Sequence, residues 1–90
     1  MNVSGILVVV PPHQVSSSTA SLNAIPGVSV HYTDPGTGRI IVTQEAETTS
    51  DEIVGLKRIK ALPNIVLAEL VYHYFEQEKA NGSIESTEDK

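Results

Sequence analysis

The sequence contains no cysteine and has few basic residues. Without cysteine, disulfides, thiolate metal sites, redox motifs and a cysteine nucleophile are excluded, and a reducing compartment is favoured. The 6 Lys and Arg residues against 11 Asp and Glu residues give a net charge of -5. This charge argues against a nucleic-acid partner, because phosphate neutralisation needs clustered basic side chains. A basic peptide is a better electrostatic match.

Long apolar runs are also lacking. No segment approaches the roughly 20 apolar residues that span a bilayer, so we expect no membrane insertion. The first residues have no basic segment followed by an apolar core and a small-residue cleavage site, as a secretory signal would. We therefore expect a cytoplasmic protein.

The 90 residues are enough for one domain. The segments 22–32 and 59–67 follow the same pattern: an apolar helix end, Pro with Gly or Asn, and an apolar strand. The patterns predict strands at 3–10, 28–33, 39–45 and 65–75, and helices at about 15–24 and 50–61. The domain is predicted to cover 1–75, and the acidic, Ser-containing segment 76–90 is predicted to be a disordered tail.

Two strand–helix–strand units joined by a hairpin make a βαββαβ order. Right-handed crossovers turn this order into an α+β ferredoxin-like sandwich, a four-stranded antiparallel sheet with two helices on one face and the first strand central. The hairpin is indicated by the turn residues of Asp34–Gly38. Thr49 and Glu52 have the spacing of a capping box at the start of the second helix.

The first and last strands are apolar on almost every position, as in Ile6–Val10 and Ile65–Phe75. A strand covered on one face alternates, whereas a continuous apolar run indicates cover on both faces. A chain this short has no second layer to supply, so the surplus apolar surface predicts a docking face for a partner.

The side-chain period of two assigns residues to the open face. The inward sets are predicted to be Leu7 and Val9 in the first strand, and Val66, Ala68, Leu70 and Tyr72 in the last. The residues predicted to form the open, peptide-binding face are Ile6, Val8, Val10, His31, Ile41, Thr43, Leu67, Glu69, Val71 and His73. We expect a monomer that binds a peptide there, and the alternative is a small regulatory domain that forms a homodimer through the same face.

Catalytic and metal-binding patterns are weak. The three histidines, His13, His31 and His73, have no supporting ligand cluster and are interpreted as surface or rim residues. Ser16 to Ser18 are interpreted as the start of a helix rather than as nucleophiles. We therefore expect no enzyme activity and no metal site.

Four stretches resemble the NapD family of cytoplasmic chaperones for periplasmic nitrate reductase. They are Ile6–Val10, Leu22–Val30 with its Ile-Pro-Gly-Val segment, Gly38–Ala46, and the Leu-Val-Tyr-His of residues 70–73. The resemblance covers residues 3–75 and implies a ferredoxin-like fold without an iron–sulfur cluster. It implies a chaperone that is not an enzyme and carries no cofactor. It also implies binding of the twin-arginine signal peptide of the nitrate reductase catalytic subunit, which is held back from export until its molybdenum cofactor is inserted. The peptide could bind as a helix on the sheet or as a strand at its edge.

Overall fold

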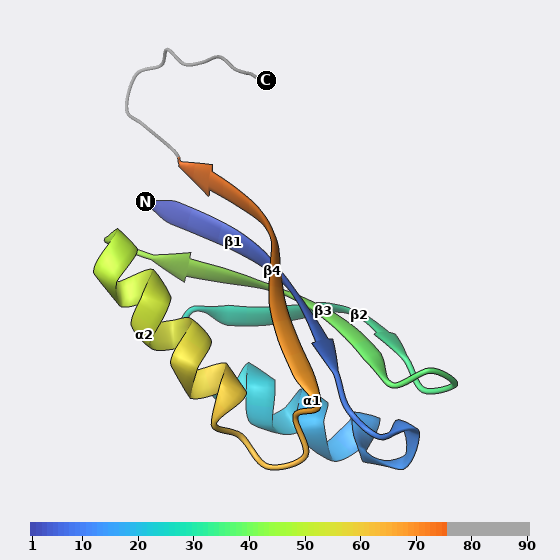
Figure 1. The fold of residues 1–90 in the computed structure, drawn as a ribbon. Helices are drawn as coiled ribbons and strands as arrows, with labels where there is room; N and C mark the ends of the chain where they lie inside the picture. The colour runs from blue at the N-terminus through green and yellow to red at the C-terminus, as the bar shows by residue number, and fades with distance from the viewer. Residues whose placement is uncertain (76–90) are drawn as a thin grey trace.

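The computed structural model describes residues 1–75 of the chain, and the tail predicted at 76–90 lies outside the described residues. Strands and helices alternate as two strand–helix–strand units joined by a hairpin (Figure 1). In chain order the elements are β1 (Asn2–Val9), the 3-10 helix η1 (Pro12–Gln14), α1 (Val15–Asn23), β2 (Val28–Asp34), β3 (Arg39–Ala46), α2 (Thr49–Lys60) and β4 (Leu67–Phe75). Among residues 1–75, none of the helices has the length and hydropathy of a membrane-spanning helix.

The four strands form one antiparallel sheet in the order β2-β3-β1-β4. β1 is therefore a central strand, and β2 and β4 are the edges. Both helices pack on one face of the sheet, and the start of β1 lies at the same end of the molecule as the end of β4 (Figure 1). The predicted α+β ferredoxin-like sandwich is confirmed.

The two connections from helix to strand each turn through a residue with positive φ. Gly27 has φ 84° and Asn64 has φ 70°. Glycine adopts this left-handed conformation without steric cost, and asparagine tolerates it better than most residues. Pro26 and Pro63, one residue earlier, prevent either helix from continuing. The pattern that repeats in the sequence therefore corresponds to a repeated structural unit.

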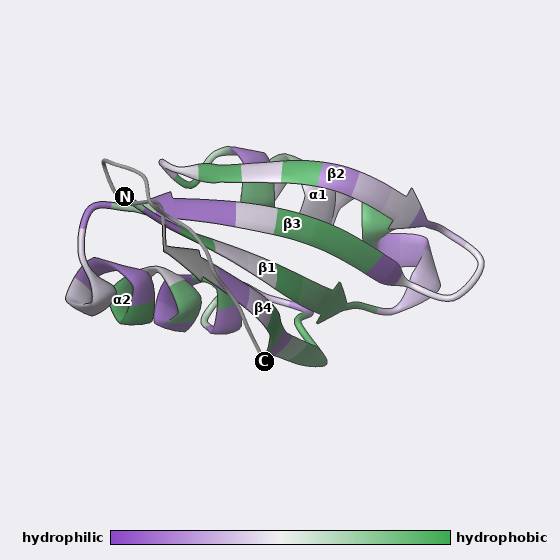
Figure 2. Ribbon diagram, turned by 90° about the horizontal axis from the view of Figure 1, so that it is seen from above, coloured by the Kyte–Doolittle hydropathy of each residue, from purple (hydrophilic) through white to green (hydrophobic). Residues whose placement is uncertain are grey.

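The hydrophobic core lies between the helices and one face of the sheet. Figure 2 shows hydrophobic residues along the central strands β1 and β3. The side chains that form this core are Ile6, Val8, Val10, Val15, Leu22, Val28, Ile40, Val42, Ile59 and Ala68. Burying each of the larger ones contributes roughly 1.5–3 kcal/mol. The helices thereby shield one sheet face, and no element among residues 1–75 covers the other (Figure 2).

The predicted orientation of β1 is wrong. Ile6 and Val8 are fully buried and Val10 is 1% exposed, so all three face the helices rather than the open side. β1 is apolar at both odd and even positions, so alternation gave no information there. Its two polar residues of the same parity, Asn2 and Ser4, also face the helices, because they hydrogen-bond to Glu52 of α2.

The N-terminal cap of α2 lies one residue before the predicted one. Thr48 is the cap, and its Oγ1 accepts a hydrogen bond from the backbone N–H of Asp51 at 3.0 Å. The predicted pairing of Thr49 with Glu52 is therefore wrong. Glu52 turns instead toward the sheet, where it is buried. Ile59 is buried on the inner face of the same helix, whereas Ile53 is 52% exposed.

Candidate functional site

A β-bulge divides β4 into two parts with opposite side-chain parity. Leu70 pairs with Ile6, Tyr72 pairs with Gly5, and Val71 between them has no partner in the register. An extra residue of this kind reverses the faces of all residues that follow it. As a result Tyr72 lies on the open face, and His73 lies on the helix face beside Ser4.

The ring of Tyr72 packs against β1 at Gly5. A Cβ built on Gly5 would overlap the Cε2, Cδ2 and Cζ atoms of the Tyr72 ring. Glycine is thus required here for the close approach of a neighbouring ring, which is one of the recognised roles of glycine within a strand. Tyr72 remains 51% exposed, so the outer side of its ring is available on the open face.

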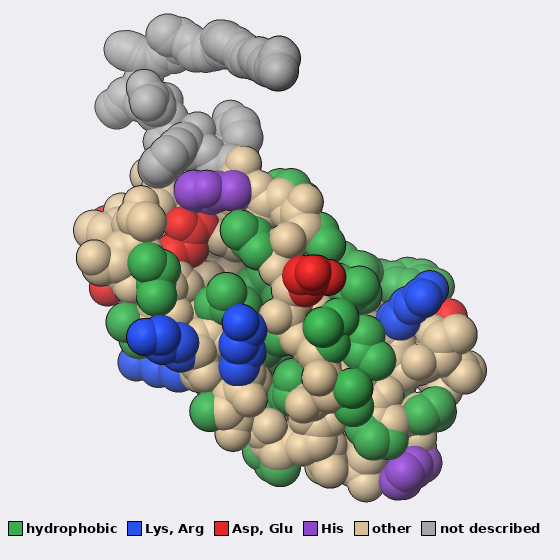
Figure 3. All heavy atoms as spheres, in the orientation of Figure 1, with side chains coloured by type: hydrophobic (Ala, Val, Ile, Leu, Met, Phe, Trp, Pro, Cys, Tyr) green, Lys and Arg blue, Asp and Glu red, His purple; other side chains and the backbone are tan. Residues whose placement is uncertain are grey.

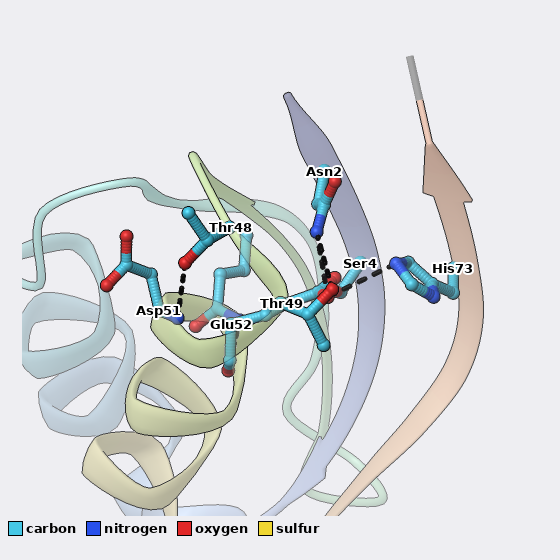
Figure 4. Close-up of polar contacts among 8 residues, drawn as sticks. Asn2, Ser4, Thr48, Thr49, Asp51, Glu52 and His73 are labelled. Carbon is cyan, nitrogen blue, oxygen red and sulfur yellow. Dashed lines mark hydrogen bonds and ion pairs between the residues drawn. The ribbon is translucent and has the colours of Figure 1, made fainter. Parts of the chain in front are cut away.

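His73 belongs to a polar cluster at the end of the core. Its Nε2 lies 3.1 Å from Oε1 of Glu52, and Glu52 also accepts hydrogen bonds from Asn2 Nδ2 and Ser4 Oγ. Figure 4 shows these side chains converging on Glu52 from β1 and β4. Gln44 of β3 donates to the backbone carbonyl of Glu52 at 3.1 Å. The cluster joins the first turn of α2 to three strands and satisfies a buried carboxylate, as burial of a charge requires.

The open face has an apolar centre formed by residues of three strands. Register places Gly5 beside Tyr72, Leu7 between Ile41 and Glu69, and Val9 beside Leu67. The apolar side chains on this face are Val3, Leu7, Val9, Ile41, Leu67 and Tyr72, with Tyr32 at the β2 edge. Leu67 is 41% exposed and Tyr32 is 55% exposed. The expected uncovered apolar surface is present, although β1 contributes other residues to it than those predicted.

Charged and polar side chains border this apolar centre. Glu69 lies on β4 beside Leu7, and Glu45 lies on β3 beside Val3. On the β2 side, His31 Nε2 and Thr43 Oγ1 are 2.8 Å apart in a hydrogen bond. Arg39, paired with Val9 and Asp34, stands at the opposite end from Glu45. The face therefore combines an apolar centre with two exposed carboxylates.

The structure places the residues predicted for this face in three groups. Those on the open face are His31, Ile41, Thr43, Leu67 and Glu69. Those on the helix face, where the prediction is corrected, are Ile6, Val8, Val10 and His73. Val71 is the bulged residue on the β4 edge and is 54% exposed.

Sequence reasoning missed the open-face residues Val3, Leu7, Val9 and Tyr72. Gly5 was the available signal: a glycine within an apolar strand indicates that another group approaches the backbone closely. On this interpretation, the side chain that approaches Gly5 lies on the open face. Val3, Leu7 and Val9 have the same parity as Gly5 and would have been assigned to that face as well. The bulge at Val71 had no comparable signal.

The arrangement offers a binding surface. Among residues 1–75, no group of three or more His, Asp or Glu side chains could hold a metal ion. The open face can bury apolar side chains of a ligand, and its carboxylates can accept charge-assisted hydrogen bonds from basic ones.

Comparison with known proteins gives the family. The family model described as "NapD protein" matches residues 1–77. The chain belongs to the NapD family. The chaperone NapD of Escherichia coli K12 is 29% identical over 76 residues, which are 84% of this chain and 87% of the relative. The chaperone NapD of Shigella flexneri has the same identity and coverage.

Solved structures agree with this assignment. The solution structure of the Escherichia coli Tat proofreading chaperone NapD matches with a TM-score of 0.76 and 26% identity, over 93% of this chain and 87% of that one. An AsnC-family transcriptional regulator of Pyrococcus furiosus matches with a TM-score of 0.68 and 19% identity, over 87% of this chain and 52% of its own. The second match concerns the fold alone. The curated relatives and the first of these solved structures are named as chaperones.

Proposed function

We propose that this NapD-family chain binds the twin-arginine signal peptide of the periplasmic nitrate reductase catalytic subunit. Bound in the cytoplasm, the peptide is withheld from export until the molybdenum cofactor has been inserted. Membership of the family and the similarity to a Tat proofreading chaperone support this function. Masking works by competition, because the chaperone and the export machinery need the same peptide and occupancy by one excludes the other.

We assign the binding site to the open face of the sheet. The single observation that carries this assignment is the apolar centre Val3, Leu7, Val9, Ile41, Leu67 and Tyr72, which no element of residues 1–75 covers. A contiguous apolar surface exposed on a small domain marks an interaction site. A signal peptide has an apolar run of matching character, and burying that run removes apolar area of both partners from water.

The carboxylates suit the basic end of the same peptide. Glu69 and Glu45 are exposed on this face, and the whole chain has a net charge of -5. Guanidinium groups form charge-assisted, often bidentate hydrogen bonds with carboxylates. Charge complementarity of this kind raises the association rate and selects for basic ligands.

Calorimetric titration of the full chain with a synthetic twin-arginine peptide tests the function. The chain should bind this peptide, and the Leu7→Glu variant should not, while both remain folded by circular dichroism. Sedimentation analysis at tens of micromolar addresses the alternative of a regulatory homodimer. A dimer that Leu7→Glu dissociates, together with absence of peptide binding by the unmodified chain, would support the alternative instead.

A further inference from the structure

A groove on the helix side of the sheet lies outside the face assigned above. It runs between α2 and the β4 edge and has a volume of about 190 Å³. Its walls are mainly apolar, from Ile6, Ile53, Leu56 and Leu70, and its polar end holds Glu52 and His73. Figure 3 shows hydrophobic side chains around this region, with acidic and histidine side chains at one end and Lys or Arg side chains at the other. Pockets for whole small molecules usually measure about 300–1,000 Å³, so this groove suits a single long side chain.

The polar end of the groove carries a negative charge that neutral donors hold in place. Asn2 and Ser4 hydrogen-bond to the carboxylate of Glu52 without compensating its charge. His73 approaches Oε1 from the outer side, and 34% of its side-chain surface is exposed, against 10% for Glu52. Because little solvent screens this carboxylate, its electrostatic attraction for a cation is stronger than that of a carboxylate on an open surface.

The apolar surface of the open face continues around the β4 edge into this groove. Tyr72 lies on the open face, Val71 at the bulge, and Leu70 on the groove wall. Their exposures are 51%, 54% and 47%. Three consecutive exposed apolar residues on an edge strand therefore connect the two surfaces without a polar interruption. A ligand that covers the open face can follow this connection to Glu52.

We propose that the groove is a subsite for one arginine side chain of the bound peptide. Its methylene groups lie along Ile53, Leu56 and Leu70, and its guanidinium replaces His73 at Oε1 of Glu52. Long basic side chains bury their stems along apolar surface in this way while the charged end reaches a partner. Arginine fits better than lysine, since the planar guanidinium is more weakly hydrated and pairs readily with a carboxylate. This inference rests on the proposed function and extends its site to the helix side of β4.

The test compares two lysine substitutions in neighbouring residues of α2. Ile53 and Val54 are 52% and 48% exposed, so neither substitution disturbs the core, and both add the same charge. Ile53 lines the groove, whereas Val54 is turned by about 100° around the helix axis and lines a different hollow, near Pro26 and Gly27. In Ile53→Lys an ammonium occupies the groove and opposes a second cation there. Val54→Lys controls for the change in net charge.

The probes are a synthetic peptide with the Arg-Arg pair before an apolar run and the same peptide with Gln-Gln in its place. Ile53→Lys should weaken binding of the Arg-Arg peptide roughly tenfold or more, the scale of one lost charge-assisted hydrogen bond. Val54→Lys should change this affinity by less than about threefold, the scale of an exposed charge. Both variants should bind the Gln-Gln peptide with the same affinity as the unmodified chain.

Three outcomes would overturn the subsite. In the first, Ile53→Lys leaves the affinity for the Arg-Arg peptide unchanged. In the second, it lowers the affinity for both peptides equally, which would indicate that the groove binds an apolar side chain. Self-association that Ile53→Lys abolishes would place a second copy of the chain there. If the unmodified chain binds neither peptide, the proposed function itself fails. If the unmodified chain binds the Arg-Arg peptide but Ile53→Lys has no arginine-specific effect, only the proposed subsite is wrong.

Discussion

The ring of Tyr72 lies directly on the backbone of Gly5, in the space that a β-carbon would occupy. This contact joins the central strand β1 to the edge strand β4 just beyond the bulge. It fixes Tyr72 on the open face and His73 on the opposite side, where His73 meets Glu52. The contact between Gly5 and Tyr72 thus orients one residue of the candidate face and one of the groove.

Gly5→Ala is expected to destabilise the domain by about 1–3 kcal/mol, the usual cost of inserting a methyl group into an occupied space. Urea unfolding measures this change. In a Tyr72→Ala background the same substitution should cost much less, because the ring it displaces is absent. A double-mutant cycle with additive effects would show that the two residues do not interact.

Glu52→Leu is expected to lower the free energy of unfolding by roughly 1–3 kcal/mol for each buried donor left without its acceptor. Ser4, at 1% exposure, loses this acceptor, and Asn2, at 4% exposure, keeps only its 3.4 Å contact with Thr49 Oγ1. His73→Ala should lower the free energy of unfolding by less. His73 is partly exposed, and its substitution removes one donor rather than the acceptor that the donors share. Thermal unfolding of both variants checks the order, and a larger loss for His73→Ala would contradict the description of the cluster.

Thr48→Ala is expected to cost about 1 kcal/mol, as is typical for an N-cap. Its hydroxyl accepts the backbone N–H of Asp51, which loses this partner in the variant. Thr49→Ala is the matched control, since Thr49 Oγ1 makes only a 3.4 Å contact with Asn2 Nδ2. Chemical denaturation should show the larger loss for Thr48→Ala, and the reverse order would restore Thr49 as the cap.

Glu69→Gln is expected to weaken binding of a twin-arginine peptide and to flatten the salt dependence of its affinity. Glu69 is exposed beside Leu7, where it can meet a basic side chain of the ligand. Glu47→Gln makes the same change of charge on the connection between β3 and α2, away from the sheet register. Equal effects of the two substitutions would show that only the net charge matters.

The sequence predicts the order of elements well because each element has a local signal. The turn residues of Asp34–Gly38 and the left-handed residues Gly27 and Asn64 stand where the chain changes direction. The face of Thr43 was predicted correctly, because this polar residue follows the apolar and fully buried Val42. These assignments depend only on neighbouring residues in the chain.

The faces of β1 and of the end of β4 depend on contacts between distant segments. Ile6 and Leu7 are equally apolar, so only pairing of Ser4 with Glu52 and of Gly5 with Tyr72 decides which of them faces the helices. The bulge at Val71 arises where β4 meets β1, and the sequence of β4 alone does not mark it. The composition of the candidate face therefore depends on the pairing of β1 with β4, which the sequence does not reveal.

Introducing glutamate into neighbouring residues of β1 gives opposite results on the two faces. Val8→Glu should unfold the domain, because it buries an uncompensated charge where the valine is fully buried. Leu7→Glu should leave the domain folded and remove peptide binding, because Leu7 lies on the open face. Circular dichroism and calorimetry separate these effects. If the Val8→Glu variant folds but does not bind the peptide, the result would contradict the assignment of Val8 to the helix face.

Intermolecular nuclear Overhauser effects between a bound twin-arginine peptide and the methyl groups of the chain test the central claim most directly. The account predicts contacts from the apolar run of the peptide to the methyls of Leu7, Val9 and Ile41, and none to those of Val8, Val10 and Val42. Contacts confined to other surfaces, with the methyls of the open face unaffected, would contradict it.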